Sequence, residues 1–189
     1  MSVRVARLSD LPQHMQDEAL HQMERIFFES SATKRFASDG ERTAFRERWL
    51  DRYLMHFPRF TYVALADISP TCAPIEGVVG YLVGCDEDPA HKALFADIGY
   101  FKVFRAMTPR YPAHLHINLD SRYRGRGIGK ILIGAFIADL KAAGVSGAHV
   151  VTARSSRSVS FYAQCGFVEQ GAYLPKGGIE VVFLARPLG

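Results

Sequence analysis

Residues 114–130 have the sequence HLHINLDSRYRGRGIGK, which carries the strongest structural signal in the chain. Between positions 114 and 120 polar and apolar residues alternate, which is the period-two pattern of a β-strand with one apolar face. An apolar pattern of helical spacing begins at Ile128. Three alternating glycines stand between them, at Gly125, Gly127 and Gly129. The stretch therefore predicts a strand, a glycine-rich turn and a helix in direct succession.

The predicted helix ends near Gly144, and a strand of buried type follows at 148–153. A strand, a helix and a second strand in this order form a β-α-β unit, whose two strands run parallel. Hydrophobic periodicity predicts the elements on both sides of this unit. Before it we expect a strand at 2–7, a helix capped by Ser9–Asp10 and reaching Phe27, a helix at 41–55, and strands at 60–66 and 77–83 joined by a turn at Pro70–Pro74. After it we expect a short helix at 156–165 and strands at 167–173 and 179–185.

These elements predict an α/β fold of the α+β kind, built on one mixed sheet of about six to seven strands. We expect the N-terminal part of the sheet to be antiparallel, the centre to hold a parallel pair, and about four helices to flank it. The length of 189 residues is close to that of one domain. We therefore expect a single domain at 1–189, with an insertion at about 86–112.

Composition and charge exclude several classes of protein. The 23 basic and 19 acidic residues give a net charge of +4, which is too small for a polybasic nucleic-acid surface. No apolar run approaches the roughly 18 residues that span a bilayer, and Met1–Leu20 lacks the pattern of a signal peptide. Cys72, Cys85 and Cys165 indicate neither a disulfide framework nor a zinc site. We expect a cytoplasmic protein that binds no metal, nucleic acid or membrane.

The glycine-rich turn has the composition of an anion-binding site. Glycines leave backbone N–H groups uncovered, and the start of the next helix adds the positive end of its dipole. Arg122, Arg124, Arg126 and Lys130 add positive charge, so a pyrophosphate is the natural ligand. The alternative is a turn that only allows the strand and the helix to pack tightly.

Two common pyrophosphate motifs do not fit this turn. A dinucleotide fingerprint, Gly-x-Gly-x-x-Gly, needs a glycine where Lys130 or Leu132 stands, and a nucleotide P-loop needs Ser or Thr where Ile131 stands. The pattern Arg/Gln-x-x-Gly-x-Gly/Ala does fit, at residues 124–129. It resembles the acetyl-CoA signature of the GNAT superfamily of N-acetyltransferases.

A second motif resembles the same superfamily. Residues 155–167, SSRSVSFYAQCGF, are similar to its Asn-x-x-Ala-x-x-Phe-Tyr-x-x-x-Gly-Phe helix, with Ser155 in place of Asn and Ser158 in place of Ala. The resemblance extends over about residues 77–185. It implies a GNAT-type acyl-CoA N-acyltransferase fold and acetyl-CoA as cosubstrate.

The resemblance also implies which residues hold the cofactor. The main chain of residues 117–119 would pair with the amides of the pantetheine arm like an added strand, and the N–H of Leu119 is the candidate donor to the thioester oxygen. The implied cofactor-binding residues are Ile117, Asn118, Leu119, Arg124, Gly125, Arg126, Gly127, Ile128, Gly129, Lys130, Ser155, Ser158 and Tyr162.

Acetyl transfer to an amine needs a neutral nucleophile, a stabilised oxyanion and a proton for the leaving thiolate. The resemblance gives the general-acid role to Tyr162; the alternative is a ring that only packs in the core. His114 and His116, about 7 Å apart on one face of the strand, are candidates for the base because imidazole titrates near neutrality. A structural role is the alternative for both. Asp120 and the acidic run Asp86–Asp88 compete as base or as a site for a cationic acceptor.

A finer resemblance concerns Tyr111–Ile117, which follows a long aromatic segment and is similar to the acetyltransferase-like domain of O-GlcNAc hydrolases and its bacterial relatives. Some domains of that group are catalytically silent, so an acetyl-CoA sensor is the alternative to an N-acetyltransferase that modifies a small-molecule or peptide amine. Phe95, Tyr100, Phe101 and Tyr111 fit either an apolar acceptor site or the core of the insertion. A homodimer is common in the superfamily.

Overall fold

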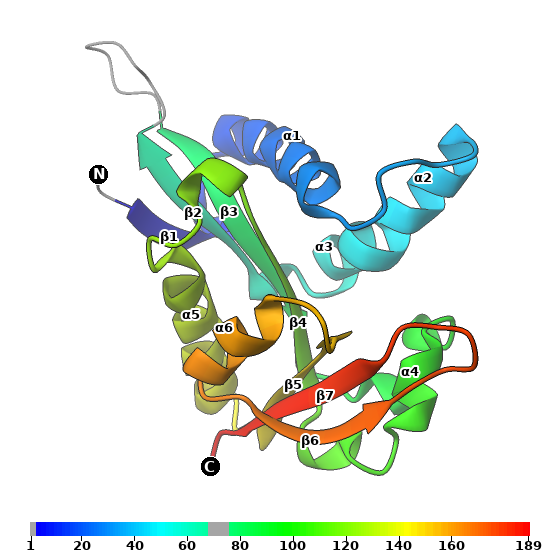
Figure 1. The fold of residues 1–189 in the computed structure, drawn as a ribbon. Coiled ribbons are helices and arrows are strands. Elements are labelled where there is room, and N and C mark those ends of the chain that lie inside the picture. Colours follow the sequence, from blue (N-terminus) through cyan, green and yellow to red (C-terminus); the bar gives the residue numbers. More distant parts are fainter. Residues whose placement is uncertain (1–2, 68–75) are drawn as a thin grey trace. The chain divides into compact units, whose positions relative to one another are not determined.

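The computed structural model describes residues 3–67 and 76–189 of the chain (Figure 1). The turn predicted at Pro70–Pro74, with Cys72 in it, lies outside the described residues. The described part forms seven strands in the order β1-β2-β3-β4-β5-β7-β6 and six α-helices. It divides into two compact units, one made of residues 1–84 and 116–136 and the other of residues 85–115 and 137–189. The two units are described in turn.

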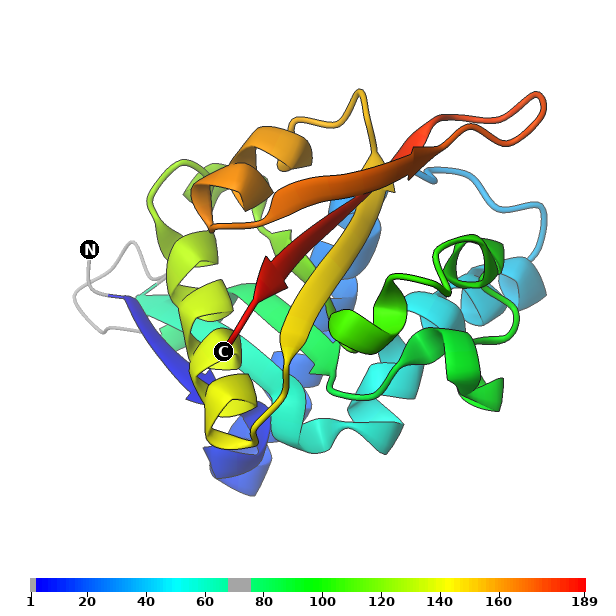
Figure 2. The same cartoon turned by 90° about the horizontal axis from the view of Figure 1, so that it is seen from below.

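The first unit contains the antiparallel part of the sheet. β1 (Val3–Arg7) pairs with β2 (Thr61–Asp67), and β2 pairs with β3 (Glu76–Cys85), both antiparallel. α1 (Gln13–Ser30) lies on one face of these strands and the beginning of α5 (Ile128–Ala142) on the other (Figures 1 and 2). The unit therefore has two layers of helix around one layer of strands, and the antiparallel N-terminal part is confirmed.

The helix α1 begins later than the sequence predicts. It starts at Gln13 with Pro12 in the N-cap position, while Ser9 and Asp10 lie in a 3-10 turn at Leu8–Asp10. A residue that precedes proline is pushed out of the helical region, and Leu11 is indeed extended. The predicted Ser9–Asp10 cap is therefore wrong, because Pro12 prevents the helix from starting there.

The helix predicted at 41–55 is a single stretch with a break in its hydrogen bonding. It consists of α2 (Asp39–Arg46), a π-helical stretch at Glu47–Asp51, and α3 (Arg52–His56). Ser38 caps α2 by accepting from the N–H of Glu41 at 3.2 Å. The hydrophobic pattern predicts that a helix is present here, but it cannot distinguish an α-helix from a helix that contains a π-helical turn.

The second unit contains the parallel pair. β5 (Gly147–Ala153) runs parallel to the first residues of β4 (Ala113–Leu119), with Ala113 opposite Ala148. β7 (Val181–Pro187) pairs antiparallel with β5, and β6 (Val168–Tyr173) pairs antiparallel with β7. Figure 2 shows β5, β7 and β6 side by side, with α6 (Ser158–Gln164) next to them. The predicted β-α-β unit with its parallel strands is confirmed.

The long segment before β4 is folded, with α4 (Gly99–Val103) and three short 3-10 turns. Phe104 and Tyr111 form a buried cluster with Phe183 and Ala185 of β7, and Phe95 and Phe101 are also buried. Of the two roles that the sequence left open for the aromatic residues, the structure favours the core of the segment over an acceptor wall.

A glycine substitution tests this packing. A Cβ at Gly147 would lie 2.8 Å from the carbonyl oxygen of Arg110, whereas a Cβ at Gly134 in α5 would have no neighbour within 4 Å. We expect Gly147→Ala to lower the free energy of unfolding by about 1–3 kcal/mol, because backbone atoms must move. Gly134→Ala is the control and should raise it by up to about 1 kcal/mol through helix propensity. Urea unfolding measures both; an unchanged Gly147→Ala would contradict the packing.

Candidate functional site

The glycine-rich turn connects the end of β4 to α5 inside the first unit. The N–H of Asp120 donates to Val79 O at 3.0 Å, and its carboxylate accepts from the N–H of Arg122 at 3.0 Å. Gly125 and Gly127 then adopt φ values of 76° and 80°, in the left-handed region that favours glycine. The N–H of Lys130 bonds to Gly127 O at 3.0 Å and forms the first turn of α5.

The two left-handed glycines border open space. A Cβ added at Gly125 or Gly127 would meet no atom within 4 Å, so a ligand can approach the main chain there. Gly129 is buried inside the first turn of α5. The first N–H groups of a helix have no partner within the helix, and the helix dipole places partial positive charge there. The turn thus has the geometry of an anion site.

The arginines around the turn make different interactions. Arg122 bonds to the Asp120 carboxylate at 2.6 Å, so its charge is compensated. The Nε of Arg124 donates to Leu119 O at 3.2 Å and ties the turn back to β4. Arg126 and Lys130 are exposed. The structure thus commits the charge of Arg122 to an internal ion pair.

The Asp120 side chain is 2% exposed and also meets Arg25 of α1 at 3.4 Å. Hydrogen bonds from the Arg122 guanidinium, and less strongly from Arg25, lower the pKa of Asp120 to about 2. A carboxylate that is held ionised in this way is a poor proton acceptor near neutral pH. The structure therefore argues against Asp120 as the general base.

Residues 117–119 form the half-buried end of β4. The side chain of Leu119 packs against the main chain of Gly80, and Asn118 Nδ2 donates to Tyr81 Oη at 2.9 Å. In the second unit the parallel ladder joins β4 to β5 at Ala113 and His114. The predicted pantetheine contacts thus fall on the part of β4 that continues into the first unit.

The two histidines of β4 have different surroundings, although the strand pattern predicts one shared face. His114 is 2% exposed and packs against Phe95, Phe101 and His149, with ring centroids 4.7, 5.2 and 5.6 Å away. His116 is half-buried in the first unit. The predicted polar face is therefore not uniformly polar, because the aromatic segment before β4 covers His114.

His116 lies among aromatic residues that the sequence did not connect with the site. Its Nε2 is 3.0 Å from Tyr53 Oη, and the ring centroids of Tyr53 and Trp49 lie 5.1 and 5.3 Å from its own. Trp49 and Tyr53 are four residues apart, a spacing that places them on one side of a helix. No local signal, however, pairs that side with a strand more than 60 residues further along.

A neighbouring histidine has a purely structural environment. His149 is fully buried, stacks on Phe183 at 4.6 Å and donates from Nδ1 to Tyr111 O at 2.5 Å. Burial lowers the pKa of His149 to about 4, so the ring is neutral at physiological pH. It packs as a core residue and gives His114 a neutral neighbour.

The second motif lies on α6 and before it, in the second unit. Tyr162 is 7% exposed, and its ring packs against Phe161 and Phe167. Burial, and then Cys165, raises the pKa of Tyr162, so the phenol keeps its proton. Ser158 Oγ bonds to Thr152 and Ser156, at 2.9 and 2.7 Å, while Ser155 is exposed.

The predicted site residues divide between the units. The first unit holds His116, residues 117–119 and residues 124–130, and the second holds His114, Ser155, Ser158 and Tyr162.

In the acidic run, Asp88 caps a turn by accepting from the N–H of Ala90, and Glu87 pairs with Lys92 at 3.1 Å. These two carboxylates therefore serve local structure.

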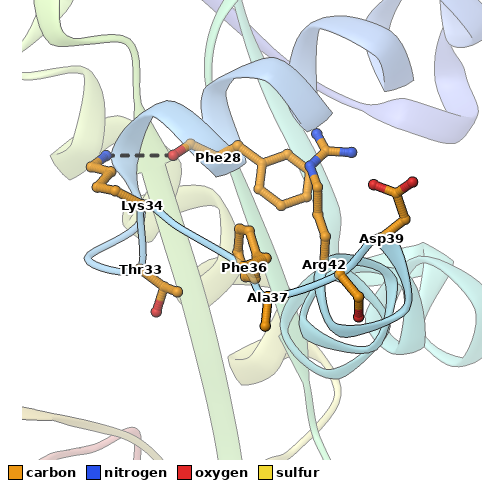
Figure 3. A pocket seen from close by; sticks show the side chains of 8 residues that line it. Phe28, Thr33, Lys34, Phe36, Ala37, Asp39 and Arg42 are labelled. Carbon is orange, nitrogen blue, oxygen red and sulfur yellow. Dashed lines mark hydrogen bonds between the residues drawn. The ribbon is translucent and has the colours of Figure 1, made fainter.

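Cavities open on the first unit, and charged residues line two of them. One of about 580 Å³ lies between the end of α1 and the start of α2 (Figure 3), where Arg42 stacks on Phe28 at 3.7 Å and Lys34 bonds to the carbonyl of Phe28. The other, of about 450 Å³, is lined by Arg25, Asp120 and Arg122, among others. In both cavities, charged residues are engaged in ion pairs or hydrogen bonds.

Over residues 3–67 and 76–189, no group of three or more His, Cys, Asp or Glu side chains is arranged to hold a metal ion. Cys85 and Cys165 are buried cysteines that form no disulfide bond. In the same part of the chain, none of the helices has both the length and the apolar character to cross a membrane.

A sequence model of the acetyltransferase (GNAT) family matches residues 18–167. This match spans most of the chain and includes both motifs. The chain therefore belongs to the GNAT acetyltransferase family, and it is an acyltransferase. The narrower likeness to the domain of O-GlcNAc hydrolases stays a prediction.

Solved structures share the fold. The chain is similar to SsHAT (20% identity, all of both chains, TM-score 0.71) and to the NatC complex bound to Gag peptide and CoA (17% identity, all of both chains, TM-score 0.64). It also resembles a phosphinothricin acetyltransferase from Sinorhizobium meliloti in complex with acetyl-CoA (20% identity, 100% of this chain and 88% of the other, TM-score 0.60). These likenesses confirm the mixed α/β GNAT fold, and two of the structures hold CoA or the predicted cosubstrate, acetyl-CoA.

The ion pairs of Asp120 predict a dependence of stability on pH. Because the pKa of Asp120 is lowered in the folded state, its contribution is complete above the unfolded pKa near 4 and is lost as the pH falls toward about 2. We expect Asp120→Asn to lower the free energy of unfolding at pH 7 by about 1–2 kcal/mol, since both arginine partners remain partly solvated. This difference should shrink as the pH falls from about 4 to about 2.

Glu29→Gln is the matched control. Glu29 is the other carboxylate that pairs with Arg25, at 2.9 Å, but its side chain is 55% exposed. We expect its substitution to change the free energy of unfolding by less than about 0.5 kcal/mol. Equal effects of the two substitutions in urea unfolding at pH 7 would show that the burial of Asp120 contributes nothing.

Proposed function

We propose that the protein is an N-acetyltransferase that moves the acetyl group of acetyl-CoA to a primary amine of a small molecule or a peptide by direct attack. The observation that carries the proposal is the turn before α5, where Gly125 and Gly127 have left-handed φ values and border open space. Main-chain N–H groups at a helix start suit a diphosphate. The family match and the CoA ligands of two similar structures support the same cosubstrate.

The proposed cofactor-binding residues lie in the turn, in β4 and in the second motif, and thus in both units. The diphosphate binds at residues 124–130, with Arg126 and Lys130 as its side-chain cations. The pantetheine arm pairs with the main chain of residues 117–119, and the N–H of Leu119 donates to the thioester oxygen. Ser155 and Ser158 contribute from the second motif; the hydrogen bonds of Ser158 to Thr152 and Ser156 hold its side chain in one position.

In the proposed reaction the neutral amine attacks the thioester carbon, the C–S bond breaks and the amine loses a proton. Tyr162 gives its phenolic proton to the leaving thiolate and later recovers one from solvent. The raised pKa of Tyr162 supports a phenol that holds its proton until that step. The same burial makes the phenol a weak acid, so close approach to the sulfur has to compensate.

Of the two candidate bases we favour His116. Its half-buried ring can exchange a proton with a bound amine, whereas the aromatic neighbours of His114 separate that ring from solvent. We assign His114 to the core together with the neutral His149. The alternative function, a silent acetyl-CoA sensor, keeps the cofactor site and needs neither Tyr162 nor His116 as a proton carrier.

Cofactor binding is tested with two glycines of equal backbone strain. Gly127 and Gly177 have φ values of 80° and 69°, and a Cβ on either would meet no atom within 4 Å. We expect Gly127→Ala to weaken acetyl-CoA binding at least about tenfold in calorimetry, because it redirects the N–H groups of the turn. Gly177→Ala has a similar backbone cost outside the turn and should keep the wild-type affinity. Wild-type affinity in Gly127→Ala would refute the diphosphate site.

Turnover separates the enzyme from the sensor. We expect coenzyme A release in a panel of polyamines, amino sugars, amino acids and lysine peptides, and a loss of about tenfold or more in Tyr162→Phe at unchanged acetyl-CoA affinity. Tyr173→Phe removes the hydroxyl of a partly exposed tyrosine of the same unit and should not change the rate. Binding without release in the whole panel would favour the sensor.

A further inference from the structure

The cavity between the end of α1 and the start of α2 has an aromatic wall (Figure 3). Phe28 and Phe36 are half-buried, and their ring centroids lie 5.9 Å apart with an interplanar angle of 84°. Phe36 also packs against Phe45 of α2, with ring centroids 5.4 Å apart. These contacts hold the apolar wall in place. The cavity volume of about 580 Å³ is in the range of sites for small molecules.

Arg42 lines the same cavity and carries hydrogen-bond donors. Its guanidinium stacks on the Phe28 ring at 3.7 Å, which fixes the plane of the group. Its ion-pair partner Glu24 is 3.7 Å away, beyond hydrogen-bond distance, and lies closer to Arg46, at 3.1 Å. Within the described part of the chain, no acceptor forms a hydrogen bond with the Arg42 guanidinium. Its N–H groups can therefore bond to a ligand.

The loop between α1 and α2 adds positive charge and is held by hydrogen bonds of its own. Lys34 Nζ donates to Glu29 O at 2.7 Å, and a carbonyl does not neutralise the charge of an ammonium group. The N–H of Ala37 donates to the Glu41 carboxylate at 2.7 Å, and Ser38 Oγ accepts from the N–H of Glu41 at 3.2 Å. These two bonds fix the start of α2, the positive end of its dipole, at the cavity.

We propose that this cavity binds a small aromatic carboxylate. A guanidinium matches a carboxylate with two parallel N–H···O bonds, and an aromatic ring packs against the rings of Phe28 and Phe36. The charged lining residues are Lys34, Arg42 and Asp39, which leaves one positive charge in surplus. This surplus suits a monoanion better than a phosphate monoester, whose charge is about −1.5 to −2. No lining residue belongs to the proposed cofactor-binding set, so this ligand is additional to acetyl-CoA.

A titration with phenylacetate, followed by ¹H–¹⁵N NMR in the protein without acetyl-CoA, tests the site. We expect the backbone signals of residues 33–42 to shift and to reach saturation. Phenylacetamide keeps the ring but has no charge, and it should bind at least about tenfold more weakly. Phenyl phosphate should also bind more weakly than phenylacetate. Equal affinities for phenylacetate and phenylacetamide, or shifts confined to other residues, overturn the proposal. Tighter binding of phenyl phosphate overturns the choice of a carboxylate.

Substitutions identify the groups that hold the ligand. The Arg42 side chain is 48% exposed, so Arg42→Met should keep the fold, and we expect it to weaken phenylacetate binding at least about fivefold. Arg35→Met is the matched control, because Arg35 is an exposed arginine of the same loop outside the lining, and it should keep the wild-type affinity. Asp39→Asn removes the negative charge of the lining and should strengthen binding.

Two results with these variants contradict the proposal. Wild-type affinity in Arg42→Met would show that the guanidinium does not hold the ligand. Weaker binding in Asp39→Asn would show that a positive group of the ligand is recognised instead. The titrations contain neither acetyl-CoA nor an acceptor amine, so their failure leaves the proposed acetyl transfer to be judged by the Gly127 and Tyr162 variants.

Discussion

A buried carboxylate joins the elements around the glycine-rich turn. Asp120 accepts from the N–H and the guanidinium of Arg122 and from Arg25 of α1, while its own N–H bonds to the carbonyl of Val79 in β3. The strand β3, the glycine-rich turn and the helix α1 therefore all contact Asp120. These contacts fix the point at which β4 ends. The ion pair also compensates the charge of Arg122.

The arrangement gives a physical reason for two residues of the motif, Arg124 at its start and the fixed glycine, Gly127. Arg124 uses its Nε to bond to Leu119 O, and so it braces the turn against the strand that leads into it. Gly125 and Gly127 provide left-handed backbone that a side chain would strain. Anion recognition by such a turn depends on the direction of its N–H groups. The φ values of the glycines set this direction, and side-chain charge contributes less to it.

Local patterns predicted most of the fold because period-two and helical spacing are decided by neighbours in the chain. They failed where a proline, an irregular helical turn or a contact between distant residues decided the outcome. Pro12 moved the start of α1, and the π-helical stretch left the amphipathic pattern of its helix intact. In the site, the glycine turn was predictable because its residues are consecutive. The contact of His116 with Tyr53 was not, because it joins elements that are distant in sequence.

The two histidines of β4 show the same limit of prediction from local sequence patterns. Alternation places His114 and His116 on one face, but it does not reveal which element covers each of them. The aromatic segment before β4 encloses His114, and the helix stretch with Trp49 and Tyr53 reaches His116. A regular α-helix through residues 47–51 would rotate Tyr53 by about 100° relative to the observed one. A local irregularity in hydrogen bonding thus determines whether the imidazole of His116 has a phenolic partner.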